Sequence, residues 1–268
     1  MNTKHLKLIS ILTVIMSVPL IIVSYYGVFI SDTYSRETSS MAAQGTGQDI
    51  VNLFFVTPLL LISLFFVRKG GKISYFIFGG TVSYILYSFI VYCFGVHFNN
   101  LFLLYCAILG LSIYTFILTI SDLKRIFTIG LVGDKIPIRS IGYFFIIVSA
   151  LFYLIWLKDI VPAIMSNAIP KSVSDYNLLV NPVHVIDISF ALPGLIITAI
   201  LLLKKESLGY ILTPICLVFI FLMAFALAAM VIMMKINGIA DDISIAVVFV
   251  VLAIISLIFL FKYLQNFK

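Results

Sequence analysis

The sequence predicts an all-α fold: a polytopic membrane protein with eight transmembrane helices in one transmembrane domain, residues 1–268. Hydrophobic residues make up 63% of the chain and charged residues only 10%, and the mean hydropathy is +1.21. A water-soluble surface needs more charge than this. Eight apolar segments are each long enough to cross a hydrocarbon core, which takes about 20 helical residues. Lys and Arg gather in alternate loops between these segments, as in multi-pass membrane proteins.

The first four segments span residues 8–30, 48–67, 73–95 and 101–120. A basic start makes the first resemble a secretory signal. We interpret it as a retained helix, because its apolar run continues through Tyr25 and Phe29, beyond the roughly 15 residues of a signal-peptide core. The second segment contains Pro58 and ends at a basic pair. The third and fourth are joined by the short polar loop "FGVHFNN", residues 94–100.

The last four segments span residues 140–160, 183–203, 208–234 and 240–262. Near the end of the fifth segment, Trp156 is expected in the aromatic belt at the membrane surface. The stretch from 161 to 182 is the longest exterior loop; it could cover a polar site as a lid or lie along the headgroups. The sixth segment contains Pro193, and the seventh and eighth are joined by a short acidic loop. The three cysteines fall inside helices, where they are expected to be packing residues.

The orientation follows from the basic residues, because short loops rich in Lys and Arg stay in the cytoplasm. With the N-terminus inside, 13 of the 17 basic residues are cytoplasmic, and the other four are Arg36, Lys158, Lys171 and Lys235. We therefore expect a protein of the cell membrane with both termini cytoplasmic. The net charge of +6 is explained by this topology and by anionic lipid, so it implies no nucleic-acid partner.

Two segments of the chain match each other around their prolines. "DIVNLFFVTP" (49–58) aligns with "HVIDISFALP" (184–193), so Asp49 corresponds to His184 and Asn52 to Asp187. A basic pair and a tyrosine follow each proline. The pattern predicts two parallel repeats, residues 1–134 and 135–268, related by an axis along the membrane normal. The second and sixth helices are then expected on either side of a central interface.

Polar residues at the exterior ends of these helices form the candidate ligand-binding site. Residues three apart share a helix face, so Asp49 lies above Asn52, and His184 above Asp187. Polar groups inside a membrane span are costly and commonly face the bundle interior. We expect them to point into a shared, outward-open pocket with His97 at its rim, although simple interfacial solvation is an equal alternative. The expected site residues are Gln48, Asp49, Asn52, His97, His184 and Asp187.

Several chemistries remain open for this cluster. His97, His184, Asp187 and Asp49 are suitable metal ligands, and haem between His97 and His184 is a weaker alternative. An Asp beside a His could also act as a general acid or base. The sequence has no hydrolase elbow and no nucleotide-binding glycine motif, so neither acyl hydrolysis nor ATP is implied. The pattern does not identify a cofactor.

Around "GQDIVNLFFVTPLLL" (47–61) and "YCFGVHFNNLFLLYCAILGLSIY" (92–114), the chain resembles an uncharacterised family of prokaryotic multi-pass membrane proteins. The resemblance implies a membrane domain and carries no assigned activity. The residues themselves favour an outward-facing pocket that binds a small or lipid-like ligand. The alternatives are a membrane enzyme at the outer leaflet, with or without a metal, and a proton-coupled transporter. Transport is the weaker of these, because the cytoplasmic halves of the second and sixth helices have few polar side chains.

Overall fold

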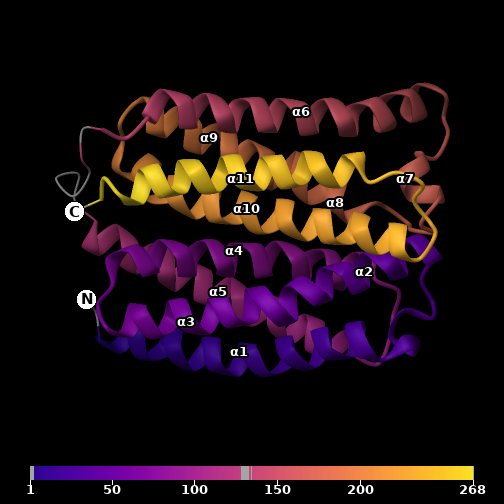
Figure 1. Ribbon diagram of the computed structural model, residues 1–268, viewed down its shortest axis with the longest axis horizontal. Helices are drawn as coiled ribbons and strands as arrows, with labels where there is room; N and C mark the ends of the chain where they lie inside the picture. The colour runs from indigo at the N-terminus through magenta and orange to yellow at the C-terminus, as the bar shows by residue number, and fades with distance from the viewer. Residues whose placement is uncertain (1–2, 128–132, 134, 268) are drawn as a thin grey trace.

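The computed structural model describes residues 3–127, 133 and 135–267, and these residues form helices with no strand among them. Eight helical stretches are long and apolar enough to cross a membrane, which confirms the all-α polytopic architecture of an integral membrane protein. Figure 1 shows the helices side by side in one bundle, with both termini at the same end. We call the opposite end, where α2 begins and α7 lies, the distal end. The expected repeat boundary at residue 134 lies outside the described residues.

The two halves of the chain are built from similar elements. The first half contains α1 (Thr3–Phe29), η1 (Ser31–Tyr34), α2 (Ser39–Val51), η2 (Asn52–Val56), α3 (Thr57–Arg68), α4 (Lys72–Gly95) and α5 (Phe102–Ile126). The second half contains α6 (Ile138–Met165), α7 (Lys171–Ser174), α8 (Pro182–Ile186), η4 (Asp187–Ala191), α9 (Leu192–Leu203), α10 (Ser207–Ile236) and α11 (Ser244–Leu264).

Most helices extend past the apolar segments that predict them, because apolar length reports the bilayer thickness and a helix can continue into polar sequence. The largest extension is α2, which begins at Ser39 instead of residue 48. Thr38 caps this helix: its hydroxyl oxygen accepts a hydrogen bond from the Met41 N–H at 3.4 Å. Such a cap satisfies one of the free N–H groups of the first turn. The extension places Gln44 and Gln48 on a rigid helix.

A π-helical turn precedes each of the two matched prolines. η2 begins at Asn52 and η4 begins at Asp187, 135 positions later, and both are five residues long. Proline has no N–H, and its ring clashes with a carbonyl in the preceding turn, so a wider turn there accommodates Pro58 and Pro193. The N–H groups of Thr57 and Leu192 close these turns on the carbonyls of Asn52 and Asp187.

The correspondence continues beyond the prolines at the same spacing of 135 residues. α3 and α9 are both 12 residues long, and they end at Arg68 and Leu203. Two residues after each of these helix ends, φ is positive: 86° at Gly70 and 58° at Lys205. The chain then turns into the long helices α4 and α10. The bounds of these matched helices therefore follow the sequence alignment.

The contact between the halves differs from the expected one. α4 and α10, the third and seventh spans, pack against each other at the centre; α2 packs on α10, and α8 lies against α4. The second and sixth spans therefore flank the central pair instead of facing each other. Glycine makes the central contact close, because a Cβ on Gly80 would lie 2.4 Å from the Val218 Cβ and 2.9 Å from the Ile215 carbonyl oxygen. A larger residue at position 80 would keep α4 and α10 from approaching this closely.

We expect Gly80→Ala to destabilise the protein by about 1–3 kcal/mol, because the added methyl group overpacks the contact between α4 and α10. Thermal unfolding in detergent measures the change. Gly110→Ala in α5 is the matched control, because a Cβ there meets nothing within 4 Å. This control is expected to keep the wild-type midpoint or raise it slightly. Equal midpoints for the two variants would contradict the close approach of the central helices.

Candidate functional site

A cavity of about 370 Å³ lies between the two halves near the distal end. Its walls come mainly from α2 and α4 of the first half and from α6, η4, α9, α10 and α11 of the second. Ser172, Tyr176, Asn181 and Pro182 are among the lining residues, so the segment between α6 and α8 covers part of the cavity. Most of the lining side chains are apolar, and a few polar groups converge at the distal end. This combination and this volume are typical of sites for small organic ligands.

Asp187 is the carboxylate that reaches this cavity from the second half. It is the first residue of η4, and its side chain is 7% exposed. The Tyr87 hydroxyl donates to Oδ1 at 2.8 Å, and the Trp156 indole N–H donates to Oδ2 at 2.8 Å. Both donors line the cavity as well. Two neutral donors from α4 and α6 therefore hold the carboxylate in place at the cavity wall.

Gln48 lines the same cavity from the first half. Its side-chain amide donates to the Tyr84 hydroxyl and to the Ser88 hydroxyl, each at 2.9 Å. Tyr84 in turn donates to Oδ1 of Asn52 at 3.1 Å. Asn52 and Asp187, which correspond in the sequence match, thus both accept from a tyrosine of α4. Asn52 itself is 1% exposed and lies behind Gln48 and Tyr84, away from the cavity lining.

Asp49 is buried inside the first half. Its side chain is 0% exposed, and it accepts hydrogen bonds from the Tyr34 hydroxyl at 2.5 Å and the Tyr92 hydroxyl at 2.9 Å. Gly27 of α1 makes room for it, because a Cβ there would lie 1.7 Å from Asp49 Oδ2. Burial, with the nearby Asp49 adding to it, raises the pKa of the Tyr34 phenol well above its usual value, so Tyr34 is a proton donor in this contact. Asp49 therefore joins α2 to η1 and α4 and does not line the cavity.

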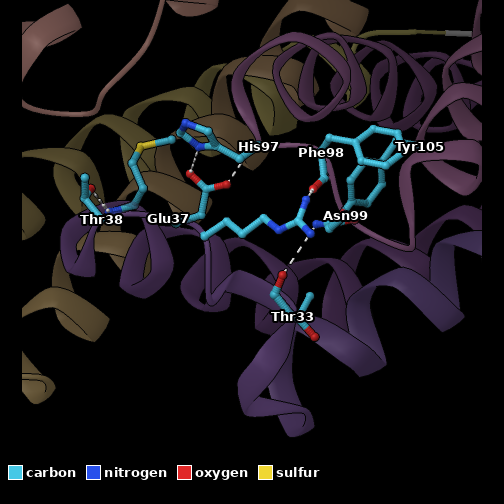
Figure 2. Close-up of polar contacts among 9 residues, drawn as sticks. Thr33, Glu37, Thr38, His97, Phe98, Asn99 and Tyr105 are labelled. Carbon is cyan, nitrogen blue, oxygen red and sulfur yellow. Dashed lines mark hydrogen bonds and ion pairs between the residues drawn. The ribbon is translucent and has the colours of Figure 1, made fainter.

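His97 lies in the loop between α4 and α5 and is paired with Glu37 (Figure 2). Its Nδ1 is 2.9 Å from Glu37 Oε2, and its backbone N–H donates to Oε1 at 2.7 Å. Beside this pair, the Asn99 amide donates to the Tyr105 hydroxyl at 3.0 Å and to the Thr33 carbonyl at 3.5 Å. Glu37 lines the cavity and His97 does not. The contacts fasten the loop after α1 to the loop after α4 at the distal end.

His184 packs against Trp156, with the two ring centroids 4.7 Å apart. It is 5% exposed, and its Nε2 has no hydrogen-bond partner among the described residues. It does not line the cavity. Its ring supports the indole that holds Asp187.

The structure thus brings two of the six expected site residues, Gln48 and Asp187, to one cavity. The other four, Asp49, Asn52, His97 and His184, lie outside the lining. The first three make hydrogen bonds to other side chains, and the His184 ring packs against Trp156. Within the described residues, no three His, Cys, Asp or Glu side chains lie close enough to hold a metal ion. The metal site considered from the sequence therefore has no converging ligand set in this part of the chain.

The sequence interpretation missed the aromatic partners. Tyr84, Tyr87 and Tyr92 recur along one helix at spacings of three and five, and that recurrence is the signal that could have identified them. Trp156 carries an aromatic-belt signal, yet its N–H turns inward to Asp187. Comparison with profiles of known protein families, with curated proteins and with solved structures finds no match. The function must therefore be argued from these residues.

Proposed function

We propose that this chain is a cell-membrane protein whose cavity at the distal end binds a small, lipid-like ligand. The observation that carries this proposal is the cavity itself, with apolar walls and a buried carboxylate, Asp187, that is held at the wall by neutral donors alone. Carboxylates within membrane spans are rare and costly, and they commonly mark binding sites or pathways. The resemblance to prokaryotic multi-pass membrane proteins supports the location and adds no activity.

The charges of the cavity favour a particular kind of polar head. Two of the lining residues, Glu37 and Asp187, are acidic, and none of the described lining residues is Lys, Arg or His. Glu37 already has a partner in His97, whereas Asp187 receives only neutral donors. A cationic or hydroxyl-bearing head would add a favourable contact to Asp187, and an anionic head would be repelled. The ligand that fits is an amphiphile without negative charge.

We also propose that the chain contains an internal repeat and that its distal end faces outward. The shared helix bounds and the two π-helical turns support the repeat. The distribution of Lys and Arg supports an outward distal end, since the basic loops lie at the end with the termini.

Cysteine labelling of intact cells tests the orientation. Thiols introduced at Ser39 and Ser174, in a chain lacking the native cysteines, are expected to react with a membrane-impermeant maleimide added outside, because both residues lie at the distal end. A thiol at Lys69 is the control and is expected to react only after the cells are opened. If the thiol at position 69 reacted in intact cells and the thiols at positions 39 and 174 did not, the orientation would be the reverse of the one proposed.

Fluorescence quenching tests ligand binding, because Trp156 is the one tryptophan in the sequence and lies at the cavity wall. The probe is a monoacylglycerol with a dibrominated acyl chain, added to protein in nanodiscs of unbrominated phosphatidylcholine. We expect saturable quenching of Trp156. Val148→Phe, which fills the cavity from α6, is expected to weaken binding by about tenfold or more, equivalent to about 1.4 kcal/mol.

The matched control for this experiment is Ile147→Phe, one residue away on α6, where the side chain is 57% exposed. It is expected to preserve the wild-type quenching curve. Quenching that never saturates, or that is the same in Val148→Phe and Ile147→Phe, would show contact with bulk lipid alone and would refute binding in the cavity.

A further inference from the structure

Two helices of the second half, α6 and α11, both border the cavity. α6 contributes Val148, Phe152 and Trp156 to the lining, and α11 contributes Phe249 and Leu252. The same two helices are in contact nearer the end that holds the termini, where the ring centroids of Phe144 and Phe259 are 5.2 Å apart. The helices therefore meet at one end and enclose the cavity between them at the other. We call the region between α6 and α11 on the distal side of Phe144 and Phe259 the seam.

Among the described residues of the first half, the corresponding helices α1 and α5 leave no such seam. There α1 packs closely against α5, and His5 Nδ1 lies 2.9 Å from Asp122 Oδ1 across the two helices. In the second half each outer helix is fastened to an inner one instead. The Ser149 hydroxyl of α6 donates to the Leu192 carbonyl at 3.5 Å, and the Ser256 hydroxyl of α11 donates to the Leu217 carbonyl of α10 at 2.7 Å. Among the described residues, α6 and α11 share no comparable backbone packing.

The distal side of the cavity is closed by polar contacts. Asp159 Oδ2 accepts from the Ser172 hydroxyl at 2.5 Å, and the Asn181 amide donates to the Ser172 carbonyl at 3.3 Å. These contacts hold residues 172–181 over the cavity, and the pair of Glu37 and His97 closes the rim on the first half. A ligand arriving from water would have to displace this cover.

The side chains that flank the seam on the outside are apolar. On α6, Ile147, Leu151 and Ile155 are each more than 50% exposed, and on α11, Val247, Val248 and Ile254 are at least 50% exposed. In a membrane these side chains face the acyl chains. An acyl chain between α6 and α11 would therefore lie against apolar surface all the way from the bilayer to the cavity.

We infer that the ligand is a bilayer-resident amphiphile that enters sideways through the seam, with its acyl chain between α6 and α11 and its head toward Asp187. This inference rests on the proposed function and adds the source of the ligand. It predicts that a cysteine inside the cavity reacts with reagents dissolved in the bilayer and is protected from charged reagents in water.

A single cysteine at Met223, which lines the cavity from α10, tests the route in a chain whose native cysteines are replaced by alanine. The two reagents are hexadecyl methanethiosulfonate, confined to the bilayer, and the charged trimethylammonioethyl methanethiosulfonate, confined to water. We expect the hexadecyl reagent to react at least about tenfold faster, since each methylene adds about fourfold to membrane partitioning.

Three further variants separate the seam from the cover. Leu252→Trp narrows the seam and is expected to slow the hexadecyl reaction by tenfold or more, whereas Val251→Trp, on the lipid-facing side of the same helix, is expected to leave it unchanged. Asp159→Ala releases Ser172 from α6 and is expected to have no effect on the hexadecyl reagent. Entry through the seam would be refuted if the charged reagent reacted faster than the hexadecyl reagent, if Asp159→Ala accelerated that reaction and if Leu252→Trp did not change it.

The design also separates this inference from the proposed function. If the monoacylglycerol protects the cysteine at Met223 but Leu252→Trp has no effect, the cavity binds ligand and the seam is refuted. If the hexadecyl reagent reacts through the seam but the monoacylglycerol gives no protection, the route is supported and binding of that ligand class is refuted.

Discussion

Replacing Asp49 with alanine is expected to lower the free energy of unfolding by about 2–5 kcal/mol, because two buried tyrosine hydroxyls lose their acceptor and each unsatisfied group costs about 1–3 kcal/mol. Tyr34 and Tyr92 both donate to this carboxylate, and it connects η1 and α4 to α2. Chemical denaturation in detergent micelles measures the change. Asp49→Asn, which keeps one acceptor oxygen, is expected to fall between wild type and Asp49→Ala.

The control for this prediction is Asp242→Ala, in the loop between α10 and α11. Hydrogen bonds from Ser244 lower the pKa of the exposed Asp242 carboxyl, so it is charged at neutral pH and makes its contacts at the surface, where water screens them. Its removal is expected to lower the free energy of unfolding by less than the removal of Asp49, because the Ser244 donors left behind can bond to water. If Asp49→Ala were no more destabilising than Asp242→Ala, Asp49 would not be the internal connection described above.

The second large effect concerns ligand selection by Asp187. Wild-type protein is expected to bind a brominated alkylammonium amphiphile at least about tenfold more tightly than the alkyl sulfate of the same chain, because the carboxylate at the cavity wall attracts one head and repels the other. Asp187→Asn preserves the size of the side chain and removes its charge. In this variant the preference is expected to fall toward equality, as measured by quenching of Trp156.

Asp175→Asn is the matched control, because Asp175 is exposed in the loop over the cavity and does not line it. It is expected to retain the wild-type preference. A preference that survives in Asp187→Asn, or disappears in Asp175→Asn, would show that long-range surface charge and not Asp187 selects the head.

The spans could be predicted from the sequence because bilayer thickness imposes a length on every apolar segment. The π-helical turns were not predicted, yet they coincide with the match around Pro58 and Pro193, since proline disturbs the same turn in both copies. The central pairing of α4 with α10 could not be predicted. It depends on the close approach at Gly80, and glycine in an apolar helix does not by itself indicate which helix packs against it.

The candidate site was predicted in part for a related reason. A charged residue in an apolar span commonly has internal partners; that argument selected Asp49 and Asp187, and both side chains are buried. It could not distinguish a carboxylate that binds helices together from one at a cavity wall. That difference depends on which side chains arrive from other helices: Tyr34 and Tyr92 enclose Asp49, whereas Tyr87 and Trp156 leave Asp187 beside open space.

The most direct test of ligand binding is an electron cryo-microscopy map of the protein in nanodiscs containing the dibrominated monoacylglycerol. We predict non-protein density in the cavity, with the glycerol head within hydrogen-bonding distance of Asp187 and the bromine atoms between α6 and α11. The same density should be missing from a map of Val148→Phe. A wild-type map with the cavity filled by rearranged side chains, and with bromine density only in the surrounding bilayer, would contradict the account.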